Sequence, residues 1–147
     1  MEPISTAIER EKERLPFGWG RFGKALDRLG ELLEPGEELE IASVGVYSKY
    51  REQHVFGELG AGQTNAVVGV TDRRLFLIGT TLRGKPLGHD AIEWAEVSDF
   101  SVVSDKKRSI AVTSPGGTAA VDSIAKSAFA DLMTAVAAHT RVRDAGG

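Results

Sequence analysis

The sequence GVTDRRLFLIG, residues 69–79, sets one aspartate and two arginines inside the most hydrophobic part of the chain. Residues 67–70 and 75–78 have the composition of two strands, so residues 71–73 occupy the bend of a hairpin. Aspartate stabilises such turns by bonding to the backbone two residues on. An arginine at the start of the next strand keeps its charge in water while its stem covers apolar surface. We interpret the charged residues as a turn between core strands, and a ligand-binding role is the alternative.

Further strand-like segments lie on both sides of this hairpin. Residues 39–47 divide into two alternating sets, Leu39, Ile41, Ser43, Gly45 and Tyr47 against Glu40, Ala42, Val44 and Val46. Short apolar runs follow at residues 97–103, 109–113 and 118–121. The sequence SPGG at residues 114–117 is a turn between the last two runs. Several short strands separated by such turns are typical of an all-β sandwich or barrel.

Helical patterns flank the strands. Residues 4–14 are charged and helix-permissive, the sequence PFGWG at residues 16–20 interrupts them, and residues 21–33 carry apolar side chains at helical spacing. A second apolar stripe predicts an amphipathic helix over residues 123–140, long enough to cover one end of a small barrel. We therefore expect a helical extension over residues 1–36 and one domain over residues 37–143, with its strands within residues 39–121.

Composition limits the class of protein. The chain has 147 residues, enough for one domain with a buried core, and it contains no cysteine. With 18 lysines and arginines against 21 aspartates and glutamates, its net charge is −3, which argues against nucleic-acid binding. No apolar run has the length of a membrane span or a signal core. These features favour a cytoplasmic protein.

Three motifs together resemble the bacterial pleckstrin-homology-like domains, in particular their YokE-like branch. They are LEPGE at residues 33–37, VTDRRLFL at residues 70–77, and Ile92 followed by VSDF at residues 97–100. The resemblance covers about residues 32–139, and the GRAM domain is a relative of the same fold. It implies a mainly β fold with α: a bent β-sandwich or half-open barrel of about seven strands, capped by the C-terminal helix. It implies no enzymatic activity, and the first helices lie outside the family pattern and pack on it.

Basic residues in several turns offer anion binding as an alternative function. In the phosphoinositide-binding members of this superfamily, basic residues of the first hairpin hold the phosphates. The corresponding residues 47–54 contain Lys49, Arg51 and His54, with Glu52 among them. A binder of anionic lipid headgroups or another small anion would use the basic residues of several turns: Lys49, Arg51, Arg73, Arg83, Lys85, Lys106, Lys107 and Arg108. The acidic balance and their scattered positions make a membrane surface the less favoured partner.

The sequence offers no set of residues for catalysis. His54, His89 and His139 fall in three separate segments, and none is paired at a metal-ligand spacing. No nucleophile elbow and no phosphate-binding glycine loop occurs. We therefore expect no metal, no cofactor and no enzymatic activity.

The aromatic segment FGWGRF, residues 17–22, has two interpretations. Its three aromatics either fill the gap between the helical extension and the barrel, or they dock on a partner. We expect a non-enzymatic binding or scaffold module that contacts a protein partner or a second copy of itself. The candidate contact residues are Phe17, Trp19, Phe22, Lys49, Tyr50 and Arg51.

Overall fold

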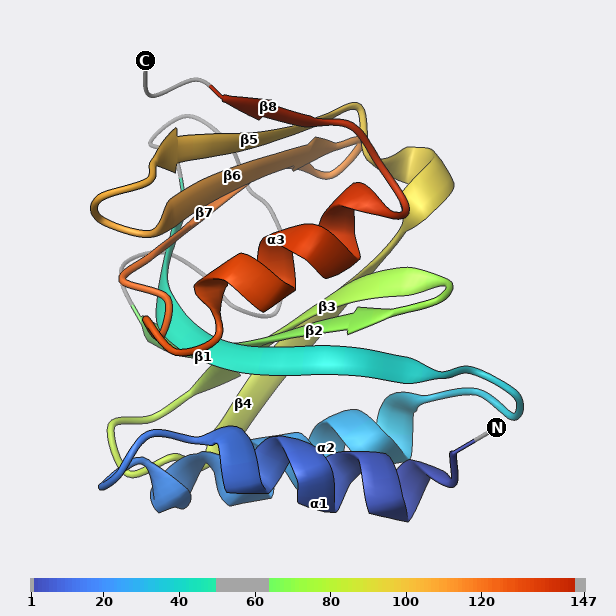
Figure 1. Cartoon of the computed structure of the whole chain (residues 1–147), viewed down its shortest axis with the longest axis vertical. Coiled ribbons are helices and arrows are strands. Elements are labelled where there is room, and N and C mark those ends of the chain that lie inside the picture. The colour runs from blue at the N-terminus through green and yellow to red at the C-terminus, as the bar shows by residue number, and fades with distance from the viewer. Residues whose placement is uncertain (1, 50–63, 145–147) are drawn as a thin grey trace.

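The computed structural model describes residues 2–49 and 64–144, and it is a mainly β structure with helices at both ends (Figure 1). Lys49 is described for its backbone only, so the anion and partner contacts expected of Lys49, Tyr50, Arg51 and His54 lie outside the described side chains. In chain order the elements are α1 (Ile4–Arg14), η1 (Gly20–Phe22), α2 (Gly23–Leu32), β1 (Leu39–Lys49), β2 (Thr64–Thr71), β3 (Arg74–Thr80), β4 (Pro86–Glu93), η2 (Trp94–Glu96), β5 (Asp99–Ser104), β6 (Ser109–Ser114), β7 (Gly117–Asp122), α3 (Phe129–Ala137) and β8 (Val142–Asp144).

The strands of the described residues form one sheet with the order β4-β3-β2-β1-β7-β6-β5-β8. All neighbouring pairs are antiparallel except β5 with β8. The long strand β1 joins the two halves, because it pairs with β2 along its length and with β7 only from Val46 to Lys49. The sheet bends there into a half-open barrel with α3 over its opening (Figure 1).

The predicted hairpin is confirmed. Strands β2 and β3 pair from Asn65 with Thr80 to Val70 with Leu75, and Asp72 and Arg73 form the bend. Every residue of β3 after Arg74 is buried, which explains why residues 75–80 lack polar alternation.

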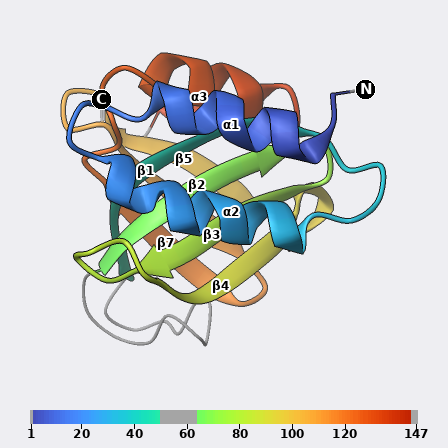
Figure 2. The ribbon, with the colours of Figure 1, turned by 90° about the horizontal axis from the view of Figure 1, so that it is seen from below.

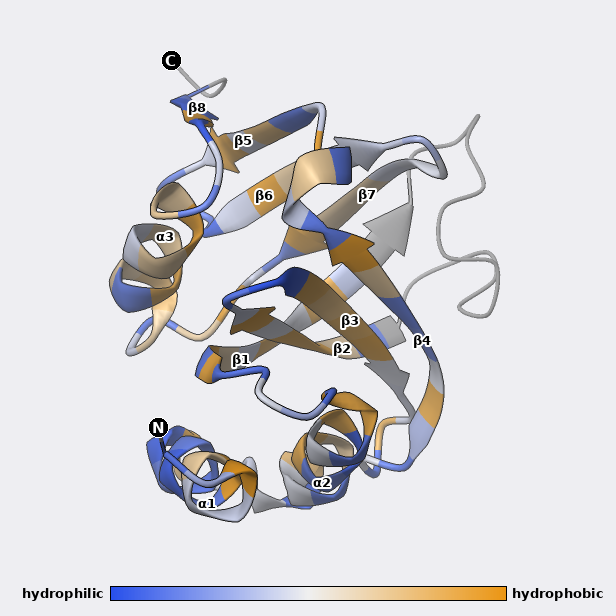
Figure 3. Cartoon of the chain, turned by 90° about the vertical axis from the view of Figure 1, so that its right-hand side faces the viewer, coloured by the Kyte–Doolittle hydropathy of each residue, from blue (hydrophilic) through white to orange (hydrophobic). Residues whose placement is uncertain are grey.

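Helices cover the sheet on two sides, as Figure 3 shows, with α3 on one side of β1–β3 and α1 and α2 on the other. The inner core lies under α3. It contains Ile41, Tyr47, Val68, Leu75, Phe100, Ile110, Ile124 and Leu132. The outer core lies under α1 and α2, whose axes run across the sheet in Figure 2. It contains Ala7, Ile8, Phe22, Leu26, Leu29, Val44, Val67, Phe76 and Ile78.

One glycine of the opening stretch allows this outer packing. Leu29 of α2 lies directly over Gly69 of β2, where an added Cβ would come within 2.8 Å of its Cδ2 atom. The missing side chain therefore lets α2 approach the sheet closely. The N-terminal region is a packed layer of the molecule, as expected.

Two strands and one helix differ from the sequence prediction. Strand β4 was missed because it is an edge strand in which only Ile92 is buried, so it lacks an apolar pattern. Strand β8 has only three residues, of which Val142 alone packs against the inner core, so it shows no sequence pattern. The helix predicted over residues 123–140 was too long: α3 spans Phe129–Ala137. The backbone N–H groups of Ile124 and Ala125 donate to carbonyls of Arg108 and Val44 instead of entering a helix.

No helix among the described residues is long and apolar enough to cross a membrane.

Candidate functional site

The charged residues of the opening hairpin form a buried structural network around Glu37. Its carboxylate accepts two hydrogen bonds from the Arg74 guanidinium, at 2.6 and 3.1 Å, and one from the Thr71 hydroxyl at 2.6 Å. The Thr71 Oγ1 atom also accepts from the backbone N–H groups of Arg73 and Arg74. These bonds fasten the α2–β1 connection to the β2–β3 turn.

The pKa of Glu37 follows from this network. Burial alone would raise the pKa of the carboxyl group. The hydrogen bonds from Arg74, from Thr71 and from the Glu34 backbone outweigh that effect and hold the pKa below its ordinary value. Glu37 is thus a paired carboxylate in the fold, with its charge matched by Arg74.

The other two residues of the hairpin bend are also used by the fold. The Asp72 carboxylate accepts from the backbone N–H of Glu38 at 2.8 Å. Arg73 donates to the Pro35 carbonyl at 3.4 Å and faces Glu34 at 4.0 Å. The turn is therefore formed with Thr71, and not Asp72, accepting from the backbone two and three residues on, while Asp72 ties the turn to the segment before β1. Arg73 lies beside an acidic residue.

The remaining basic residues considered for anion binding fall into two separate turns. Arg83 and Lys85 are exposed in the β3–β4 turn, and Lys106, Lys107 and Arg108 lie in the β5–β6 turn. Figure 1 shows the first turn below β1 and the second above it. The fold therefore brings together the cations within each turn and keeps the two turns apart.

The three aromatics of residues 17–22 have three different environments. Phe22 is buried in the outer core, with the Arg21 guanidinium 4.5 Å from its ring centroid. Trp19 is partly buried and packs edge-on against Phe22, with the ring centroids 6.0 Å apart. Phe17 is fully exposed. The segment thus agrees with both interpretations, because Phe22 fills the outer core and Phe17 is exposed where a partner can contact it.

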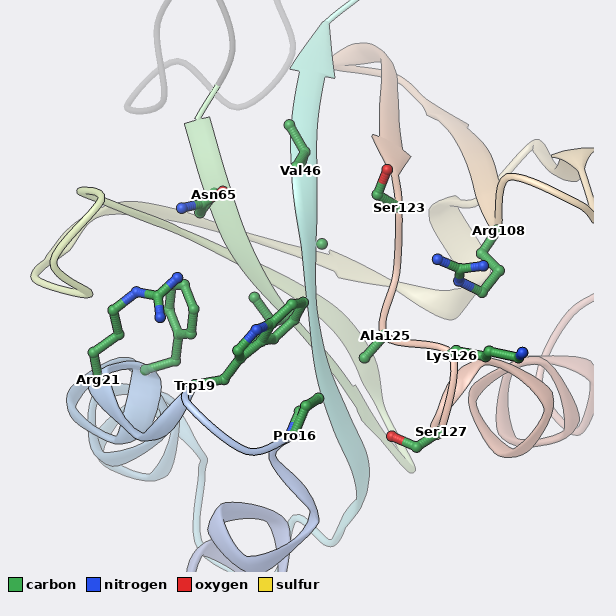
Figure 4. A pocket seen from close by; sticks show the side chains of 13 residues that line it. Pro16, Trp19, Arg21, Val46, Asn65, Arg108, Ser123, Ala125, Lys126 and Ser127 are labelled. Atoms are coloured by element: carbon green, nitrogen blue, oxygen red, sulfur yellow. The ribbon is translucent and has the colours of Figure 1, made fainter.

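Trp19 lies in the middle of a groove of about 830 Å³ (Figure 4). We call it the Trp19 groove. Its lining comes from three parts of the chain: the α1–α2 connection, the strands β1 and β2, and the β7–α3 connection with Arg108 next to it. The lining residues are Pro16, Trp19, Arg21, Phe22, Val44, Gly45, Val46, Asn65, Arg108, Ser123, Ala125, Lys126 and Ser127.

Backbone contacts fix the wall of the groove formed by residues 123–127. The Ala125 N–H donates to the Val44 carbonyl at 3.0 Å, and the Arg108 Nε donates to the Ile124 carbonyl at 2.6 Å. This approach requires glycine at position 45, because an added Cβ would lie 2.6 Å from Val121 Cγ1 and 3.0 Å from the Asp122 carbonyl oxygen. The groove is therefore bounded by packed elements.

The lining of the groove is apolar in its centre and positive at its sides. Among the lining residues that the structure describes, three are cations, Arg21, Arg108 and Lys126, and none is acidic. Arg21 donates to the carbonyls of Leu82 and Gly18, at 3.0 and 2.8 Å. Figure 4 shows Arg108 and Lys126 on one side of Trp19 and Arg21 on the other.

Sequence reasoning named four of the lining residues as candidates or neighbours of candidates: Trp19, Arg21, Phe22 and Arg108. It missed Asn65, Lys126 and Ser127, because each is an ordinary surface residue in its own segment. No local motif marks them, since the groove exists only where three distant segments meet. In the sequence, the high aromatic content of residues 17–22 is the feature that points to this groove.

Comparison with known proteins gives a fold and no function. No family model matches the chain, and no curated protein matches it. Among solved structures, the C-terminal domain of an unknown protein from Leishmania infantum is similar, with a TM-score of 0.50 and 19% identity. The match covers 80% of this chain and 96% of that domain. At this identity the likeness shows a common fold alone.

Proposed function

We propose that this chain is a non-enzymatic binding module of the pleckstrin-homology-like class and that the Trp19 groove is its binding site. The groove itself carries the proposal. Its volume is in the range of about 300–1,000 Å³ typical of ligand sites, and its apolar lining with a few polar groups is the usual character of such sites. Trp19 offers a large flat surface at its centre.

The assignment to the pleckstrin-homology-like class is supported by how the sequence motifs meet in space. The motif at residues 33–37 supplies Glu37, and the motif at residues 70–77 supplies Thr71 and Arg74, which bind that carboxylate. Ile92 of the third motif pairs with Leu75 of the second in the β3–β4 ladder, and the nearby Trp94 donates its indole N–H to the Thr71 carbonyl at 2.9 Å. Residues of all three motifs thus lie in or next to one structural junction. A cytoplasmic location is part of the same proposal and agrees with a chain that has no cysteine.

Binding without catalysis is supported by the residue types in the groove. In the described part of the groove, Ser123 and Ser127 supply the only hydroxyl groups, and no histidine or carboxylate is present there to act as a base or nucleophile. The cations of the lining suit the recognition of negative charge.

A protein partner, or a second copy of the chain, is the first candidate occupant of this face. Phe17 is fully exposed beside Pro16, which lines the groove. Exposed aromatics are favoured at protein interfaces. An anion is the second candidate, and the three cations of the lining favour it. The two are compatible, because a partner can contact Phe17 while the groove holds a ligand.

The binding of a neutral apolar dye tests whether the groove is a site. We expect Nile red to gain fluorescence with the wild-type protein. Ser127→Phe adds a bulky ring at the exposed edge of the groove and should reduce this gain several-fold. The matched variant Thr134→Phe, on the exposed face of α3, should keep it. Equal fluorescence from the two variants would place the dye elsewhere and argue against the groove.

Light scattering after size exclusion tests the second copy as partner. If copies associate through this face, Phe17→Ser lowers the measured mass toward that of a monomer. Leu87→Ser, which changes another exposed apolar residue, leaves the mass unchanged. A wild-type chain that is monomeric at every concentration would reject self-association.

A further inference from the structure

We infer that the ligand of the Trp19 groove is a free, single-chain amphipathic anion: an aliphatic chain that ends in a carboxylate or a phosphate. The inference rests on the proposed function, since it takes the groove to be a binding site, and it adds the chemical class of the ligand. Three observations carry it: the shape and apolar lining of the groove, the unpaired cations on its wall, and the contribution of the N-terminal extension.

The residues at the centre of the groove indicate that the ligand has an apolar part. Pro16, Trp19 and Val46 are partly exposed and present carbon surface around this centre, with Val44 and Ala125 buried behind them. An aliphatic chain that covers this surface removes it from water, which stabilises the complex by about 25 cal/mol for each Å² buried. A small inorganic anion would leave the same surface exposed and gain nothing from it.

The charged part of the ligand is set by Arg108 and Lys126. Among the described residues neither of them takes part in an ion pair. The Arg108 side chain donates one hydrogen bond, from Nε to the Ile124 carbonyl. That bond holds the side chain in place and leaves its terminal amino groups for a ligand. A guanidinium binds carboxylate and phosphate groups through paired hydrogen bonds, so it suits either head group.

The three cations of the groove show no ion pair among the described residues, and the same holds for Lys24, Arg83, Lys85, Lys106, Lys107 and Arg141. The other seven described arginines and lysines are matched by carboxylates. The pairs include Arg10 with Glu11, Lys12 with Asp27, Arg74 with Glu37, and Arg143 with Asp99. A chain with net charge −3 that nevertheless keeps three cations and no acid around an apolar groove has a local charge complementary to an anion.

The site differs from an anion site formed by hairpin turns alone, because among its described lining residues the β5–β6 turn contributes Arg108 and the β3–β4 turn contributes none. Pro16, Trp19, Arg21 and Phe22 come from the N-terminal extension, which lies on the outer face of the sheet. The site is thus built jointly by the extension and the barrel. A single aliphatic chain fits such a groove at the surface, whereas a bilayer would need several cations on one exposed plane.

Calorimetric titration with a set of small amphiphiles tests the inference. The probes are octanoate, octyl phosphate, neutral octanol, octylammonium and acetate. We expect octanoate and octyl phosphate to bind, octanol to bind at least about fivefold more weakly, and octylammonium more weakly still. Acetate, which lacks the chain, should not bind. Added salt should weaken the binding of octanoate and leave that of octanol unchanged.

Two variants locate the head group. Lys126→Glu should weaken octanoate binding about fivefold or more and leave octanol unchanged. Arg141→Glu, the matched control at an exposed cation beyond the C-terminal end of α3 and outside the groove lining, should change neither. Arg108→Gln should have the larger effect, and since its Nε bond supports the fold, its thermal unfolding is measured in parallel. If Arg108→Gln does not fold, Lys126→Glu alone decides the result.

Three other results of these binding experiments would each refute the anion, the groove or the free amphiphile. Equal affinity for octanoate, octanol and octylammonium would refute the anion and keep the groove as a site. Failure of every octyl compound, together with no Nile red signal, would refute the groove and with it the proposed function. Sedimentation with phosphatidylglycerol vesicles but not with phosphatidylcholine vesicles, without octanoate binding, would show a membrane surface as the source of the anion and refute the free amphiphile.

Discussion

The carboxylate of Glu37 has the most consequential single position in the chain. Its side chain is completely buried, yet it sits in a sequence, residues 33–37, that resembles a surface turn. Residue-level reasoning predicted the turn at residues 71–73 because aspartate and the following strand residues mark it locally. It did not predict that Arg74 pairs with Glu37, since a contact between residues 37 positions apart leaves no local pattern.

Removal of the Glu37 charge should destabilise the fold. Glu37→Gln leaves the mostly buried Arg74 without its partner, so we expect the free energy of unfolding to fall by about 3 kcal/mol. The control is Glu34→Gln, an exposed carboxylate 3.6 Å from the same guanidinium, which should cost less than about 1 kcal/mol. Urea unfolding followed by circular dichroism measures both. If the two variants lose the same free energy of unfolding, the buried Glu37–Arg74 pair does not contribute more than the exposed Glu34.

The same residue predicts how stability depends on pH. The folded pKa of Glu37 lies below its ordinary value of 4.5, so its ion pair stabilises the fold fully above that pH. This contribution is lost as the pH falls through the lowered folded pKa. The difference in unfolding free energy between the wild type and Glu37→Gln should therefore be constant near neutral pH and shrink in acid. A difference that grew in acid would show that the folded pKa of Glu37 is raised and not lowered.

At the scale of elements, periodicity identified the helices and most of the strands but misplaced one boundary. The apolar stripe of the third helix continues back to Ile124, which is buried as predicted. Ile124 reaches the core from an extended segment, because residues 123–125 bond to the β5–β6 turn and to β1. Periodicity reports which side chains are buried, and the hydrogen bonds to neighbouring strands decide whether the backbone is helical. The exposed edge strand β4 gave no such periodicity.

The close contact of β1 with β7 gives a prediction at this scale. Gly45→Ala places a Cβ against Val121 and the Asp122 carbonyl, so we expect a loss of about 1–3 kcal/mol in unfolding free energy. Gly116→Ala is the matched control, because its added Cβ would meet only the Ser114 hydroxyl, at 3.8 Å. It should change stability by less than about 1 kcal/mol. Thermal and urea unfolding of the two variants check the difference, and equal stabilities would refute the close packing.

At the scale of the whole molecule, the N-terminal extension and the barrel depend on one another. The extension packs on the sheet through the outer core, as expected for helices that lie outside the pattern of the resembled family. The Trp19 groove could not be predicted, since its walls are brought together only by the folded chain. The resemblance to pleckstrin-homology-like domains covers the barrel, while part of the proposed site comes from outside it.

Deletion of the extension should expose the outer face of the sheet. A chain that starts at Leu32 leaves Val44, Val67, Phe76 and Ile78 without the helices that cover them. We expect this chain to aggregate or unfold. Circular dichroism and light scattering would detect either result. A folded, monomeric truncated chain would show that the extension is a separable element.

The most direct test of the account is nuclear magnetic resonance of the full-length ¹⁵N-labelled protein during titration with octanoate. The account predicts that the largest shifts occur at the Trp19 indole N–H and at the backbone amides of Val46, Ser123 and Lys126. The amide of Thr134, on the exposed face of α3 and outside the groove lining, should not shift. Shifts centred on the β3–β4 turn, or no shifts at saturating octanoate, would contradict the Trp19 groove as the binding site.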